Sequence, residues 1–154
     1  MITHKRNRLQ RIVAALAIIV LPWLSSCSPD LTDDPIPFLP FSPIHINLNL
    51  PEYIALRSDR GSLIIDGGVQ GIILYREDAT TYFAYERNCS FQPNNACAIV
   101  DIDPSTLFMT DPCCSSIFDF TTGFPTGGPA WRPLRKYETI LNGPELTITD
   151  NIME

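Results

Sequence analysis

The chain has 154 residues, with 17 acidic and 11 basic side chains and a formal net charge of −6. All 17 acidic residues follow residue 26 but only 7 of the basic ones do, so the chain from residue 27 onward carries a charge of −10. A charge of this sign argues against binding to nucleic acid and against electrostatic attraction to anionic lipid. The length predicts one domain with a modest hydrophobic core.

The first 26 residues have the pattern of a secretory signal. Four basic residues lie among the first eleven, and an apolar run of 13 residues (12–24) follows them. This run is too short to span a bilayer, which takes about 20 apolar residues, but it suits a signal peptide. The next residues, Leu24-Ser25-Ser26-Cys27, resemble the lipobox of bacterial lipoproteins. The resemblance implies cleavage before Cys27, lipidation of Cys27 and anchoring in the membrane through the lipid.

We therefore expect a lipid-anchored protein of the cell envelope. Ser28 follows Cys27, and no aspartate is present there to signal retention in the inner membrane, so the outer membrane is the expected location, on its periplasmic or surface face. Residues 27–43 contain five prolines and three aspartates, which predict an extended tether whose apolar residues are able to dock on the domain.

Short β-type segments separated by turn residues fill residues 44–150. Residues 44–50 alternate apolar and polar side chains, as in a half-buried strand. The segments of this kind are, in chain order, 44–50, 61–77, 80–89, 98–112 and 131–150. The last predicts a hairpin that turns at residues 142–144, and residues 151–154 are assigned to a C-terminal tail. Strong helix patterns are absent, so the sequence predicts an all-β domain.

Several landmarks in these segments resemble the Rieske iron–sulfur domain. The segment "YFAYERNCS" ends at Cys89 and Ser90, where that family has a strand that runs into Cys-x-His. The later segments "SSIFDFTTG" and "GGPAWRPLRKY" are similar to the family's second loop and the sequence after it. The matching landmarks are Phe118-Asp119, Gly123, Gly128-Pro129-Ala130, Pro133-Leu134 and Tyr137. The resemblance covers residues 44–150 and implies antiparallel β-sheets with two cysteine-bearing loops.

Most cluster ligands of that family are replaced in this chain. A Rieske cluster uses two cysteines on one iron and two histidines on the other. The resemblance places Cys89 and Asp111 at the two cysteine positions, and Phe91 and Cys114 at the two histidine positions. A phenyl ring cannot bind iron, and His45 is the only histidine after residue 26. We therefore predict a degenerate member of the family that binds no standard [2Fe–2S] cluster and no other cofactor.

Four cysteines remain once Cys27 is lipidated: Cys89, Cys97, Cys113 and Cys114. An even number of thiols in an oxidising compartment predicts two disulfides. A bond between the adjacent Cys113 and Cys114 is disfavoured, and the residues alone leave the other two pairings open. Some Rieske proteins have a disulfide between the cluster loops, with one cysteine two residues after the second ligand cysteine, which is the position of Cys113. This resemblance implies Cys97–Cys113 and Cys89–Cys114.

Metal binding is the alternative to these disulfides. Four thiolates, from Cys89, Cys97, Cys113 and Cys114, would suffice for a [2Fe–2S] electron-transfer centre of non-standard ligation or for an all-thiolate zinc site. Adjacent ligands are awkward for a cluster, and the compartment disfavours free thiols, so we expect no metal.

A binding or structural module is expected rather than an enzyme. Ser115 and Ser116 have no nearby base in the sequence to activate them as nucleophiles. The loops that would cover a cluster carry Phe91, Pro93, Ile117 and Phe124, and we expect their apolar tips to form a surface for a protein partner in the envelope.

Overall fold

The structure is a computed structural model that describes residues 34–153. The signal segment 1–26, the lipidation residue Cys27, residues 28–33 of the tether and Glu154 lie outside the described residues. Within residues 34–153, no helix is both long and apolar enough to cross a membrane.

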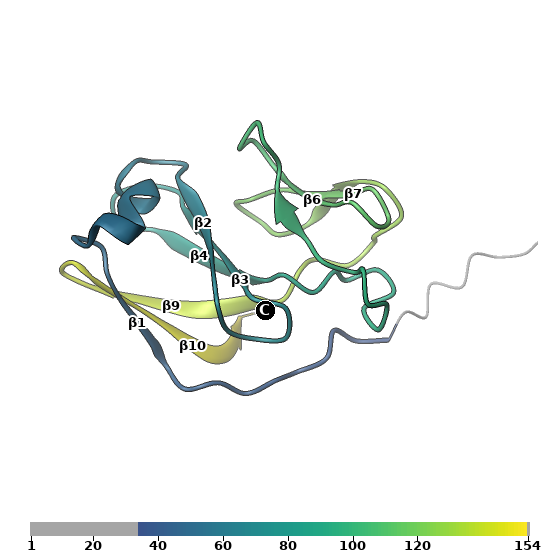
Figure 1. The fold of residues 1–154 in the computed structure, drawn as a ribbon, viewed down its shortest axis with the longest axis horizontal. Helices are drawn as coiled ribbons and strands as arrows, with labels where there is room; N and C mark the ends of the chain where they lie inside the picture. Colours follow the sequence, from purple (N-terminus) through teal and green to yellow (C-terminus); the bar gives the residue numbers. More distant parts are fainter. Residues whose placement is uncertain (1–33, 154) are drawn as a thin grey trace, which may run out of the picture. The chain divides into compact units, whose positions relative to one another are not determined.

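The ten strands within residues 34–153 form two sheets, and every pairing in them is antiparallel (Figure 1). The first sheet has the order β1-β10-β9-β4-β3-β2 and consists of β1 (Ile44–Asn47), β2 (Ser62–Ile65), β3 (Ile72–Arg76), β4 (Tyr82–Glu86), β9 (Lys136–Asn142) and β10 (Glu145–Met153). The second has the order β5-β6-β7-β8 and consists of β5 (Asp101–Ile102), β6 (Met109–Asp111), β7 (Ser116–Phe118) and β8 (Pro125–Gly127). The predicted all-β class with antiparallel sheets is confirmed.

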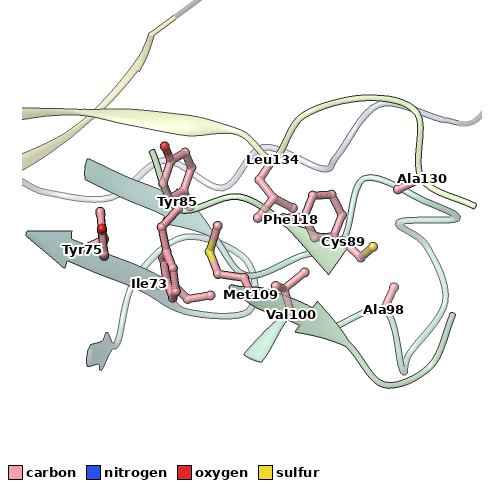
Figure 2. Packing of buried hydrophobic residues seen from close by; sticks show 11 residues of the cluster. Ile73, Tyr75, Tyr85, Cys89, Ala98, Val100, Met109, Phe118, Ala130 and Leu134 are labelled. Carbon is pink, nitrogen blue, oxygen red and sulfur yellow. The ribbon is translucent and has the colours of Figure 1, made fainter. Parts of the chain in front are cut away.

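Strand β3 is buried on both faces. Successive side chains of a strand point to opposite sides, so Ile73 and Tyr75 join one apolar cluster while Ile72 and Leu74 join another. This explains why the segment reads as an uninterrupted apolar run without alternation. The first cluster, here called the inter-sheet core, draws on both sheets and on the loops between them (Figure 2). Its buried members are Ile73, Tyr75, Tyr85, Cys89, Ala98, Val100, Met109, Phe118, Phe120, Ala130 and Leu134.

A short helix, η2 (Pro51–Arg57), lies where the sequence predicts none. It is a 3-10 helix with Pro51 in its first turn, where the missing N–H of proline costs nothing. Glu52 lies in the first turn and Arg57 in the last, which suits the helix dipole. Only Leu56 of this helix is fully buried, in the second apolar cluster. One buried residue in seven gives no helical periodicity in the sequence.

The C-terminal hairpin has the turn that the sequence predicts. Asn142 pairs with Glu145, and Gly143 between them has φ 59°, a conformation that glycine adopts without strain. Residues 151–153, assigned to a tail from the sequence, instead continue β10. The strand passes through a register shift after residue 148 and then pairs Ile152 with Tyr137, which keeps its end on the sheet.

The described end of the tether, residues 34–43, forms no strand but contacts the domain. Ile36 is buried, and the ring of Phe41 packs edge-on against Tyr137 with centroids 5.1 Å apart. The guanidinium of Arg135 donates hydrogen bonds to the carbonyl oxygens of Ile36 and Pro37. These contacts hold residues 36–41 against the folded part.

Candidate functional site

The four cysteines lie on two loops. The first cysteine loop, residues 87–100, connects β4 to β5 and carries Cys89 and Cys97. The second cysteine loop, residues 112–115, connects β6 to β7 and carries Cys113 and Cys114. These positions agree with the two cysteine-bearing loops that the resemblance implies.

Backbone hydrogen bonds close both loops. In the first loop, the Cys89 N–H donates to the carbonyl oxygen of Ala98 at 3.0 Å. In the second loop, the Ser115 N–H donates to the carbonyl oxygen of Asp111 at 2.7 Å, and Ser115 has φ 61°. The second loop is therefore a tight turn that brings Asp111 and Cys114 together.

Cys97 and Cys113 form a disulfide between the loops. Their Cα atoms are 5.7 Å apart, a usual distance for a disulfide. This is one of the two bridges that the resemblance implies. Because both sulfurs are bonded, they provide no thiolates, and the alternative four-cysteine ligand set of Cys89, Cys97, Cys113 and Cys114 is not present in the structure.

Cys89 and Cys114 differ from the prediction, because the second implied bridge is not formed. Both are free thiols, with Sγ atoms 4.0 Å apart, whereas bonded sulfurs are about 2.05 Å apart. Cys89 is fully buried in the inter-sheet core (Figure 2), and Cys114 is half-buried. Other polar groups lie beside the Cys114 Sγ, namely Asp111 Oδ2 at 3.2 Å and Ser116 Oγ at 3.1 Å. Hydrogen bonding to these groups holds the thiol without a covalent bond.

Asp111 is a fully buried carboxyl group next to these thiols. Its Oδ1 accepts a hydrogen bond from the Cys113 N–H at 2.7 Å, and its Oδ2 faces Cys114 Sγ. None of the ion pairs among residues 34–153 includes Asp111. A buried carboxylate without a cationic partner is costly, so the favourable neighbour for this group is a positive charge.

The buried thiol is not a reactive one. Burial raises the pKa of the Cys89 thiol, and the hydrogen bond to Asp111 raises it further. Since the thiolate is the nucleophile, a raised pKa lowers reactivity at neutral pH. Ser116 is no nucleophile candidate either, because it is fully buried and its Oγ accepts a hydrogen bond from the Ala130 N–H at 3.0 Å.

Neither histidine position of a Rieske cluster carries an imidazole here. Phe91 is half-buried and packs against the inter-sheet core. His45 lies on β1 with its side chain 61% exposed, and its Nδ1 contacts Glu145 Oε1 at 3.1 Å and Thr147 Oγ1 at 3.2 Å. The residues at the four ligand positions therefore do not fit a cluster that needs two cysteines and two histidines.

Two glycine landmarks of the resemblance shape the surroundings of the site. Gly128 has φ 82°, and a Cβ there would lie 2.5 Å from the Cα of Ser116, directly after the second cysteine loop. Gly123 has φ 72°, and a Cβ there would lie 2.6 Å from the Tyr85 ring. Only glycine allows such close packing with positive φ. These landmarks therefore serve the fold and do not require a bound cluster.

The predicted apolar surface on the loop tips is largely turned inward. Pro93 is buried, Phe91 and Ile117 are half-buried, and Phe124 alone of the four is clearly exposed, at 56%. The Asn88 side chain donates a hydrogen bond to the Pro93 carbonyl oxygen at 2.9 Å, which draws the first loop toward the interior. This local contact has no pattern in the sequence.

Two solved structures are similar to this chain. The first is the ferredoxin of carbazole 1,9a-dioxygenase from Nocardioides aromaticivorans IC177, with 20% identity and a TM-score of 0.47, covering 71% of this chain and 98% of that one. The second is the complex of reduced oxygenase and oxidized ferredoxin in carbazole 1,9a-dioxygenase, with 18% identity and a TM-score of 0.45, covering 60% of this chain and 83% of that one. No protein-family model and no curated protein matches the chain.

Proposed function

We propose that the protein is a lipid-anchored component of the cell envelope, in the outer membrane, whose Rieske-like domain carries no [2Fe–2S] cluster. It acts as a binding or structural module and not as an enzyme. The observation that carries this proposal is the set of residues at the four ligand positions, where a half-buried phenyl ring replaces one imidazole and a carboxyl group replaces one thiolate.

The ligand positions have changed, whereas the glycines and backbone contacts that shape the surrounding loops are present. Gly123 and Gly128 keep the close packing described above, and Ala130 still donates to Ser116 at 3.0 Å. Loop packing without the cluster ligands supports a role that depends on the surface and the stability of the domain. The lipid anchor brings that surface to the membrane, and the expected partner is another envelope protein.

Protein purified from the native envelope without air tests the cluster. We expect no iron–sulfur absorption bands and no stoichiometric iron or sulfide. A coloured sample with about two irons and two sulfides per chain, as in a [2Fe–2S] centre, would overturn the proposal and favour electron transfer instead.

The lipid anchor is tested with Cys27→Ser. Because Cys27 ends a sequence similar to a lipobox, the variant is expected to incorporate no labelled fatty acid and to leave the membrane fraction, or to remain as an unprocessed precursor. Ser26→Ala, which leaves Cys27 in place, is the control and should be labelled as the wild type. A Cys27→Ser protein that is still acylated and still sediments with membranes contradicts the anchor.

A further inference from the structure

We propose that Cys89, Asp111 and Cys114 bind a single zinc ion. One ligand atom of each residue, the two Sγ atoms and a carboxylate oxygen, lies within 4.8 Å of the other two. This inference goes beyond the proposed function and does not depend on it. The ligand set also differs from the four-thiolate set considered from the sequence, because Cys97 and Cys113 are bonded to each other.

The spacing of the ligand atoms suits a tetrahedral ion. Zinc bonds of about 2.3 Å to sulfur and about 2.0–2.2 Å to oxygen place two sulfurs about 3.8 Å apart, and a sulfur and an oxygen about 3.5 Å apart. The two Sγ atoms are 4.0 Å apart, and Cys114 Sγ is 3.2 Å from Asp111 Oδ2. A disulfide would require the sulfurs to approach each other by about 2 Å. These two distances are compatible with a shared zinc ion and are too long for a disulfide.

Backbone N–H groups already point at two of the three ligands. The Phe91 N–H donates to Cys89 Sγ at 3.5 Å, and the Cys113 N–H donates to Asp111 Oδ1 at 2.7 Å, which leaves Oδ2 for the metal. Donors of this kind fix the orientation of metal ligands and stabilise their negative charge.

Ser116 is the hydrogen-bond partner of the third ligand, and its Oγ accepts from the Cys114 thiol. Its Oγ lies 3.1 Å from Cys114 Sγ and accepts a hydrogen bond from the Ala130 N–H. A hydroxyl group has one proton to donate. The Ala130 N–H occupies a lone pair of Ser116 Oγ and leaves the hydroxyl proton free. If zinc replaces the proton of Cys114, the Ser116 hydroxyl can donate that free proton to the sulfur.

The donor chemistry selects zinc over the hard cations. Calcium and magnesium take oxygen ligands and would leave two thiols unused, whereas zinc binds thiolates together with carboxylates. The ion would also supply the positive charge that the buried Asp111 lacks. Binding displaces the two thiol protons, so zinc affinity rises with pH. Three protein ligands leave a fourth position for water or for a group of a partner.

The disulfide supports this site from outside. It fixes Cys113, the residue beside Cys114, to the first cysteine loop that carries Cys89. Ligands from two separate loops are therefore held together before the metal arrives. The bond also removes the two thiols that would otherwise compete for the ion.

The test uses the protein as it is purified from the expressing cells in detergent and without air, stripped with a chelator and dialysed against zinc chloride. We expect one zinc per chain, and with cobalt in place of zinc a sulfur-to-cobalt charge-transfer band from two thiolates. Asp111→Asn keeps the side-chain shape and an oxygen acceptor for the Cys113 N–H. Loss of a group that only orients a ligand typically weakens metal affinity by about 10- to 100-fold. Asp111→Asn should weaken zinc affinity by more than this, and so should Cys114→Ser.

Two further variants separate ligation from folding. Ser116→Ala removes an orienting hydrogen bond and should weaken zinc binding by about 10- to 100-fold without changing the stoichiometry at saturation. Asp119→Asn is the matched control, because Asp119 Oδ1 accepts from the N–H groups of Thr121 and Thr122, which an amide oxygen also does. This control should bind zinc as the wild type does.

Three results would overturn the zinc site. They are less than stoichiometric zinc, an affinity that Asp111→Asn leaves unchanged, and a Cys89–Cys114 disulfide in peptide maps of the native protein. A colourless protein that binds neither iron nor zinc would refute the zinc site and leave the proposed function intact. Stoichiometric iron together with sulfide would refute both the zinc site and the proposed function.

Discussion

The two cysteine pairs connect the same two loops in different ways. Cys97 and Cys113 are exposed and covalently bonded, whereas Cys89 and Cys114 lie deeper and remain thiols in contact with buried polar groups. The outer pair stabilises by restricting the unfolded chain for as long as the bond stays oxidised. The inner pair contributes only what its hydrogen bonds or a bound ion provide. Neighbouring cysteines in one sequence motif, Cys113 and Cys114, thus have separate roles.

Breaking the outer pair should have the largest effect on stability. The disulfide closes a loop with a sequence separation of 16, so Cys97→Ala should lower the free energy of unfolding by about 3 kcal/mol. Cys113→Ala should cost the same, and the double variant little more, because each change removes the same bond. Urea unfolding with a chelator present measures this. Additive losses would contradict a shared bond.

Gly128→Ala should have an intermediate effect on the second cysteine loop. The added Cβ would lie 2.5 Å from the Ser116 Cα at a residue with φ 82°, and strain of this kind costs about 1–3 kcal/mol. Gly127→Ala is the matched control, because its Cβ would meet only the Ile117 side chain at 3.5 Å. Thermal unfolding of both variants should show a clear loss for Gly128→Ala alone. An equal loss for both would mean that the close approach is not the cause.

Cys114→Ser should have the smallest effect in the absence of metal. Cys114 is half-buried and unbonded, and a serine hydroxyl can still reach the Asp111 carboxyl group. The expected change is at most about 1 kcal/mol, the usual size for a single replacement that leaves no cavity and no unpaired buried group. Zinc should stabilise the wild type but not this variant. A loss as large as that of Cys97→Ala would show that the inner pair is also a bridge in solution.

The sequence predicts the sheets well because strand patterns are local. The alternation in residues 44–47 and the Asn-Gly turn of the C-terminal hairpin both follow from neighbouring residues, and the structure has a strand and a turn there. Helix η2 has no such local signal, because its stability depends on the buried contact of Leu56 with residues far away in the chain. The continuation of β10 depends likewise on pairing with Tyr137 across the sheet.

The candidate site could be predicted only in part, for a similar reason. The landmarks predict the positions of Cys89, Asp111 and Cys114, but an aspartate at a cysteine position of the Rieske pattern indicates a lost ligand rather than a possible one. Asp111 is buried and belongs to none of the ion pairs among residues 34–153, which changes that interpretation and depends on how the two loops pack. The contact of Ser116 with Cys114 depends on the tight turn at Ser115 and has no signature in the sequence.

The hydrogen bonds from Arg135 to the carbonyl oxygens of Ile36 and Pro37 limit the distance between the domain and its proposed anchor. If the lipid sits on Cys27, as proposed, only residues 27–33 separate it from the first residue that the structure describes. Seven residues span at most about 25 Å, even when fully extended. Under that proposal the domain would stay near the bilayer surface, and any partner would have to meet it there.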